Sequence, residues 1–68
     1  HVALRNADER SQAIAALPDA QRAVFVLSHF EDLPYVEIAR ILDIPEGTVK
    51  SRMHHACRKL REALAEEE

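Results

Sequence analysis

Apolar residues recur at helical spacing along the chain, and prolines separate the segments that carry them. The first apolar stripe covers residues 13–17 and lies directly before Pro18. Because proline interrupts a continuing helix, this helix must end there. Asn6 precedes Glu9 by three residues, which is the spacing of an N-terminal capping pair. The pattern therefore predicts a first helix that starts near Asn6 and ends before Pro18.

Three further helices are predicted downstream. Residues 18–32 are so rich in apolar side chains that we expect this helix at the centre of the domain. After a break at Pro34, helical spacing returns over residues 35–42 and again over about 46–65. A turn of three residues joins the last two helices, and its first residue, Asp43, tolerates the left-handed backbone conformation better than most residues.

Composition supports a helical fold. The chain has 68 residues, 47% of them hydrophobic, and only one glycine, which favours helices over sheet. We expect an all-α, small four-helix domain that occupies residues 1–68 as a single unit. The chain starts at His1 without an initiator methionine, which suggests a fragment of a longer protein. A lone Cys57 and the lack of any signal peptide or membrane-spanning apolar run indicate a cytoplasmic setting.

Charge is unevenly divided along the chain. The formal net charge is −3, yet residues 48–61 contain five Lys or Arg and no acid. Residues 1–47 hold four Arg against eight acids, and residues 62–68 hold four Glu. Because salt screens distant acids within about 8–10 Å, a local basic segment can still form a nucleic-acid footprint.

The basic segment lies on the fourth predicted helix, opposite its apolar stripe. Helical spacing places Val49, Met53, Ala56, Leu60 and Leu64 on one side. The outward residues are the candidate DNA-binding set: Thr48, Lys50, Ser51, Arg52, His54, His55, Arg58, Lys59 and Arg61. Lys and Arg at the edges would contact phosphates, and Ser, His and Arg at the centre would reach base edges in the major groove. A solvated amphipathic helix is the alternative, but the preceding short helix and tight turn favour a helix-turn-helix at about residues 34–61.

Residues 17–64 closely resemble the C-terminal domain, region 4, of bacterial extracytoplasmic-function (ECF) sigma factors. The resemblance rests on LPDAQRAVF, YVEIA, IPEGTVKSR and RKLREAL, which occur in this order at the family's spacing. It implies the winged-helix-like, three-helical DNA-binding core of sigma region 4. It also implies binding to the promoter −35 element, docking on the β-subunit flap of RNA polymerase, and a possible anti-sigma partner.

The same resemblance implies particular roles and shows some departures. It implies that Lys50, Ser51, His54 and His55 read DNA bases. It also implies that Thr48, Arg52 and Arg58 contact the DNA phosphate backbone. The chain departs from the family's usual pattern at Pro34, where a Ser cap is common, and at Asp43, where a Gly is common. It also departs from that pattern at Cys57. His55 replaces a common Arg, and His cannot pair bidentately with guanine, so the preferred base sequence depends on this position.

Two other readings stay open. The output domain of a LuxR-type response regulator has a very similar EIA and GTVK pattern and would bind a palindromic site as a dimer. Alternatively, the acidic first two helices would make the domain mainly a module that binds polymerase or an anti-sigma factor.

No catalytic, cofactor or metal site is expected. Neighbouring His54 and His55 point about 100° apart, and the pair His54 and Cys57 has no further ligands near it in sequence. We expect Cys57 to be a small packing residue, and Phe25, Phe30 and Tyr35 to be core residues. Any of these aromatic rings that is left exposed would be a candidate contact for the polymerase.

Overall fold

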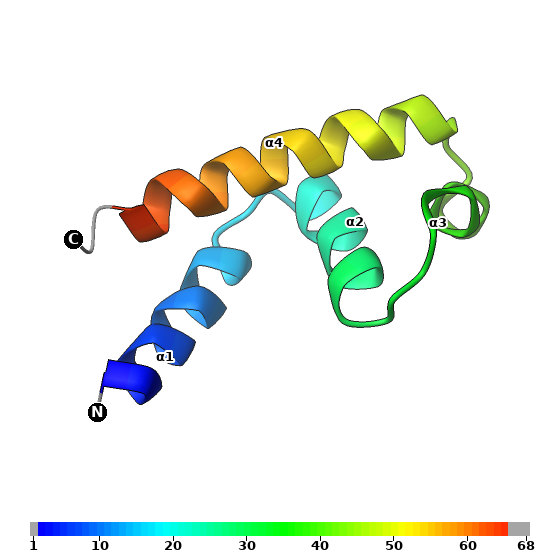
Figure 1. The fold of residues 1–68 in the computed structure, drawn as a ribbon. Coiled ribbons are helices and arrows are strands. Elements are labelled where there is room, and N and C mark those ends of the chain that lie inside the picture. The colour runs from blue at the N-terminus through cyan, green and yellow to red at the C-terminus, as the bar shows by residue number, and fades with distance from the viewer. Residues whose placement is uncertain (1, 66–68) are drawn as a thin grey trace.

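The computed structural model describes the backbone of residues 2–65 and the side chains of residues 8–64. Four helices follow one another: α1 (Val2–Ala15), α2 (Asp19–His29), α3 (Tyr35–Leu42) and α4 (Glu46–Ala65) (Figure 1). No strand occurs within residues 2–65, so the all-α prediction is confirmed and this part of the chain has no wing.

The predicted start of the first helix is wrong. α1 begins at Val2, four residues before Asn6. The intervening residues include Ala3, Leu4 and Arg5, which are among the strongest helix formers. Helix propensity therefore outweighs the capping signal at Asn6.

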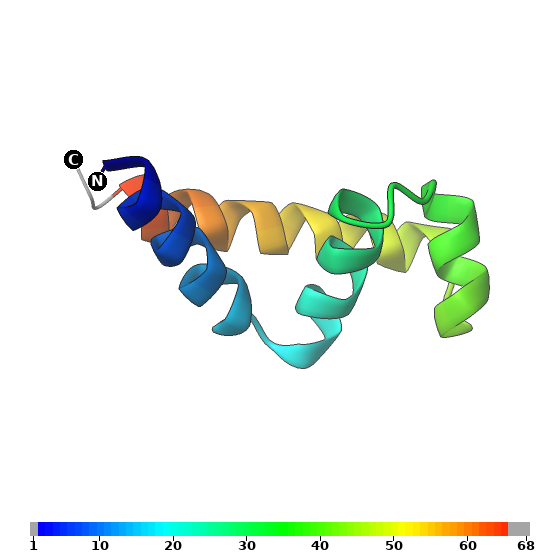
Figure 2. The ribbon, with the colours of Figure 1, turned by 90° about the horizontal axis from the view of Figure 1, so that it is seen from below.

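Helix α4 is the longest helix, and the other three pack against it. Its 20 residues span about 30 Å, and α1, α2 and α3 each pack against it. In Figures 1 and 2, α3 lies at its N-terminal end, α2 farther along it and α1 toward its C-terminal end. Helix α2 lies between α1 and α3 along α4 (Figure 1) and contributes the fully buried Val24 to the core, as expected of a central helix, while α4 is the helix against which the other three pack.

The main core joins α2, α3 and α4. Val24, Ile38 and Val49 are completely buried, and Met53 is nearly so. Burying side chains of this size contributes about 1.5–3 kcal/mol each. Because one residue of α3 and two of α4 belong to this cluster, the core fixes the angle between those two helices.

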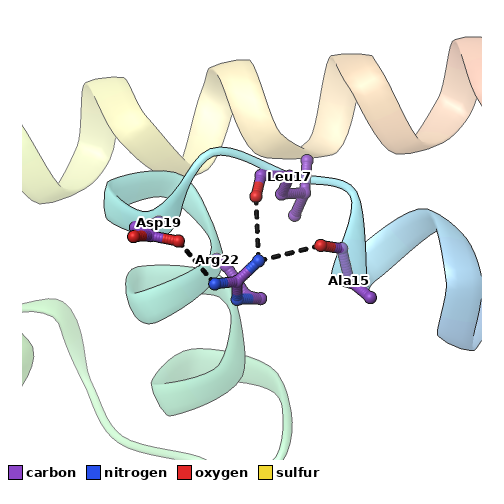
Figure 3. A network of polar contacts seen from close by, with 4 residues as sticks. All are labelled: Ala15, Leu17, Asp19 and Arg22. Atoms are coloured by element: carbon purple, nitrogen blue, oxygen red, sulfur yellow. Dashed lines mark hydrogen bonds and ion pairs between the residues drawn. The ribbon is translucent and has the colours of Figure 1, made fainter.

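The junction between α1 and α2 is held by a polar network (Figure 3). Arg22 Nη1 donates hydrogen bonds to the carbonyl oxygens of Ala15 at 2.8 Å and Leu17 at 3.0 Å. Its Nη2 pairs with Asp19 Oδ1 at 2.6 Å. Carbonyls at a helix C-terminus lack partners within the helix. Arg22 therefore caps the end of α1 from the first turns of α2.

Candidate nucleic-acid interface

Helices α3 and α4 form the helix-turn-helix, and a defined backbone motif sets the turn between them. Asp43 has φ 58° and ψ 50°, the left-handed conformation that the sequence predicts. Its N–H donates to the carbonyl oxygen of Arg40, and the N–H of Ile44 donates to that of Ala39. These two bonds define a Schellman motif, which closes the C-terminus of α3.

Helix α4 then begins directly after Pro45. The N–H groups of Thr48 and Val49 donate to the Pro45 carbonyl at 3.0 and 3.2 Å, as the first bonds of the helix. Helical geometry leaves the N–H groups of Glu46 and Gly47 without partners inside the helix. Such groups and the helix dipole favour an anion at this end.

The candidate DNA-binding residues share one solvent-facing side of α4. The exposed members are Lys50, Ser51, His54, His55, Arg58, Lys59 and Arg61. Thr48 and Arg52 are half-buried. Figure 1 shows the other three helices on one side of α4 only, while Val49, Met53 and Ala56 are buried. The structure thus brings the predicted residues together on a face that a flat or grooved partner can approach.

The middle and margins of this face differ. His54 and His55 lie at its middle, with ring centroids 5.8 Å apart. Lys50 lies at the α3 margin, where it lines a shallow hollow with Tyr35, Gly47 and the acidic Glu46. Lys59 lies at the opposite margin and borders α1. The face therefore has imidazoles between flanking cations.

One acid also belongs to this face, and the sequence reasoning missed it. Glu62 is exposed and lies four residues after Arg58 and eleven after Ser51, so it continues the same row of side chains. Glu62 Oε2 is 4.0 Å from Arg58 Nε, and the two side chains are 71% and 59% exposed. Extending the helical projection by one turn would have revealed this acid.

A second surface lies between α1, α2 and the C-terminal half of α4. It is a groove of about 320 Å³, lined mainly by apolar and aromatic side chains. Its lining is Arg10, Ser11, Ile14, Phe25, His29, Phe30, Leu60 and Leu64. The rings of Phe25 and His29 stack with centroids 5.1 Å apart, and Phe30 meets both edge-on.

Two expected packing residues are in fact exposed. Phe30 is 61% exposed because it follows the last residue of α2 and lies beyond the packed turns. Cys57, which was expected to pack, is exposed and carries a free thiol. Phe25 and Tyr35 are half-buried against the core.

The described residues contain no group of three His, Cys, Asp or Glu side chains placed to hold a metal ion. Within the same part of the chain, no helix combines the length and apolarity that a bilayer crossing requires.

Comparison with known proteins identifies the domain. Residues 10–60 match the family model described as Sigma-70, region 4. SigW of Bacillus subtilis, an ECF RNA polymerase sigma factor, is 43% identical over 63 residues, which cover 93% of this chain and 34% of that protein. The ECF sigma factor RpoE of Cereibacter sphaeroides is 43% identical over 54 residues, covering 79% of this chain and 30% of RpoE. SigL of Mycobacterium tuberculosis is 45% identical over 56 residues, covering 82% of this chain and 32% of SigL.

The chain thus spans about a third of the length of these curated relatives. A LuxR-type output domain is not favoured, because the matched family is that of sigma factors. The exposed cationic side of a helix-turn-helix, the family match and the similarity to three ECF factors agree: this chain belongs to the sigma-70 region 4 family, as a domain of the ECF sigma factor type.

Proposed function

We propose that this domain recognises the promoter −35 element by placing the outer face of α4 in the DNA major groove. The observation that carries the proposal is the exposed set of cations and imidazoles on the second helix of a helix-turn-helix. In such motifs the second helix enters the groove while the first crosses the backbone. The whole of residues 1–68 would act as a single binding domain, in the cytoplasm and without catalysis.

The dimensions of α4 fit this role. Residues 50–58 extend over about 12 Å of helix axis, which is about the width of the B-DNA major groove. Ser51, His54 and His55 lie at the middle of the exposed face, where they would meet base edges, and Arg58 lies beside them, where it would hold a phosphate. Lys50, Arg52, Lys59 and Arg61 lie toward its edges, where phosphates would be, and Thr48 sits at the anion-favouring start of the helix.

We also propose that the groove between α1, α2 and α4 receives the β-flap of RNA polymerase, and that an anti-sigma factor can compete for the same surfaces. Phe30 supports this, because a large ring that is 61% exposed beside an apolar groove offers contact area to a protein partner. Both readings from the sequence can therefore hold in one domain, one on each side of α4.

Selection from a pool of random DNA duplexes tests the DNA-binding proposal. The 68-residue chain should enrich one asymmetric motif, and Arg58→Ala should weaken binding to it. Failure to enrich any motif would contradict the proposal. Enrichment of a palindrome bound by two copies would instead favour a dimeric regulator.

A further inference from the structure

We infer that Glu62 is an internal competitor for the DNA backbone: it pairs with Arg58 in the free domain and thereby limits DNA affinity. This inference rests on the proposed function, because it concerns the same face of α4. It adds a residue whose effect on binding is opposite in sign to that of the nine candidate contacts.

The position of Glu62 supports the inference. Ser51, His55, Arg58 and Glu62 follow one another at intervals of four, three and four residues, which is the spacing of a single row along a helix. All four are exposed. Glu62 therefore belongs to the row that would face the duplex, at the end of the row where it also borders α1.

The contact between Glu62 and Arg58 explains how the acid could limit DNA binding. Glu62 Oε2 lies 4.0 Å from Arg58 Nε, at the limit of an ion pair. A guanidinium prefers two parallel hydrogen bonds to a phosphate or carboxylate. Glu62 lies on the Nε side of the Arg58 guanidinium. A phosphate that uses this edge must displace the carboxylate, and a phosphate bound by the two Nη groups would share the cation with it, so the two anions compete for one positive charge.

The position of Glu62 along the α4 axis, beyond the last proposed DNA contacts, also supports the inference. A straight helix leaves the curving groove after a few turns, and Glu62 lies about 6 Å beyond Arg58 along the axis. At that point the helix passes the phosphate backbone. A carboxylate there is repelled by the phosphates, which marks the end of the DNA-contacting segment.

The test uses the full 68-residue chain and its Glu62→Gln variant with a fluorescent DNA duplex of random sequence, because phosphate contact does not depend on sequence. At low salt we expect Glu62→Gln to bind about three- to fivefold more tightly, with a steeper salt dependence. Glu31→Gln is the matched control, since it removes the same charge from an exposed site at the end of α2. Thermal unfolding should show both variants folded like the parent.

A double-mutant cycle separates competition from simple charge repulsion. In the Arg58→Ala background, Glu62→Gln should give a clearly smaller gain than in the parent. Equal gains in both backgrounds, or a gain no larger than that of Glu31→Gln, would overturn the inference. If Arg58→Ala and Lys50→Ala leave DNA affinity unchanged, the proposed function itself fails, which is a different result.

Discussion

Ile44 donates its backbone N–H to the carbonyl oxygen of Ala39 at 3.0 Å, across the turn of the helix-turn-helix. The bond requires the left-handed conformation of Asp43 between them. Left-handed backbone is strained for residues with a Cβ and free for glycine. An acid at this place also faces the negative end of the α3 dipole.

Replacement of Asp43 by glycine should therefore stabilise the domain, by about 0.5–1 kcal/mol after the larger chain entropy of unfolded glycine is subtracted. Thermal unfolding should show a rise of a few degrees, since about 1 kcal/mol shifts Tm by about 4–8 °C in domains of this size. Asp43→Asn separates the two causes, because it removes only the charge. A lower Tm for Asp43→Gly would contradict the strain account.

Loss of the Arg22 side chain should loosen the junction between α1 and α2. Arg22→Ala leaves the Ala15 and Leu17 carbonyls without their donor, and bonds that involve a charged group contribute about 1.5–3 kcal/mol. Because the junction is partly solvated, we expect a loss of about 1–2 kcal/mol in urea unfolding.

Asp19→Asn is the control for that experiment. The Asp19 side chain is 95% exposed, and exposed ion pairs contribute less than about 1 kcal/mol. If the two variants lose equal stability, the ion pair rather than the carbonyl bonds holds the junction.

Lys50→Ala and Arg58→Ala should each weaken binding to every DNA sequence and reduce the slope of log K against log salt by about 1. The physical reason is that each cation releases about one counterion from the duplex. Arg10→Ala removes an exposed cation from α1 and should leave the slope unchanged. An unchanged slope for Lys50→Ala would remove that residue from the interface.

Phe30→Ser should weaken binding to an isolated β-flap fragment while DNA affinity stays unchanged. The ring is largely exposed, but it packs edge-on against Phe25 and His29, so the substitution should also lower stability by about 0.5–1.5 kcal/mol. Ile41→Ser removes an apolar side chain that is 57% exposed on α3, away from the groove. Calorimetric titration of both variants tests the site, and equal losses would contradict a role for the groove.

The helices were largely predictable because periodicity and proline carry local information. Helix α3 begins and ends at the predicted residues, Tyr35 and Leu42, since Pro34 and the Asp43 turn bound it on both sides. The start of α1 was not predictable from Asn6, because a capping signal competes with strong helix formers before it. No such competition exists at the other helices, which follow prolines.

The sequence allowed us to predict which side of α4 carries the candidate site, but not how deeply each of its side chains is buried. Helical spacing correctly placed Ser51, His54, His55 and Arg58 on the side opposite the core. It could not distinguish half-buried Arg52 from exposed Lys59, because that difference depends on which neighbouring helix covers each margin. Arg22 was unpredictable as a cap for the same reason, since its partners lie across a turn between two helices.

Helix α4 supplies both the outer face and, through Leu60 and Leu64, one wall of the groove. No hinge separates the two, so their relative orientation depends on the number of residues between them. One inserted residue between Arg58 and Leu60 would rotate one surface against the other by about 100° and shift it by about 1.5 Å. Side chains on either surface can therefore vary independently, whereas the proposed binding of two partners at once would constrain the residue count between the surfaces.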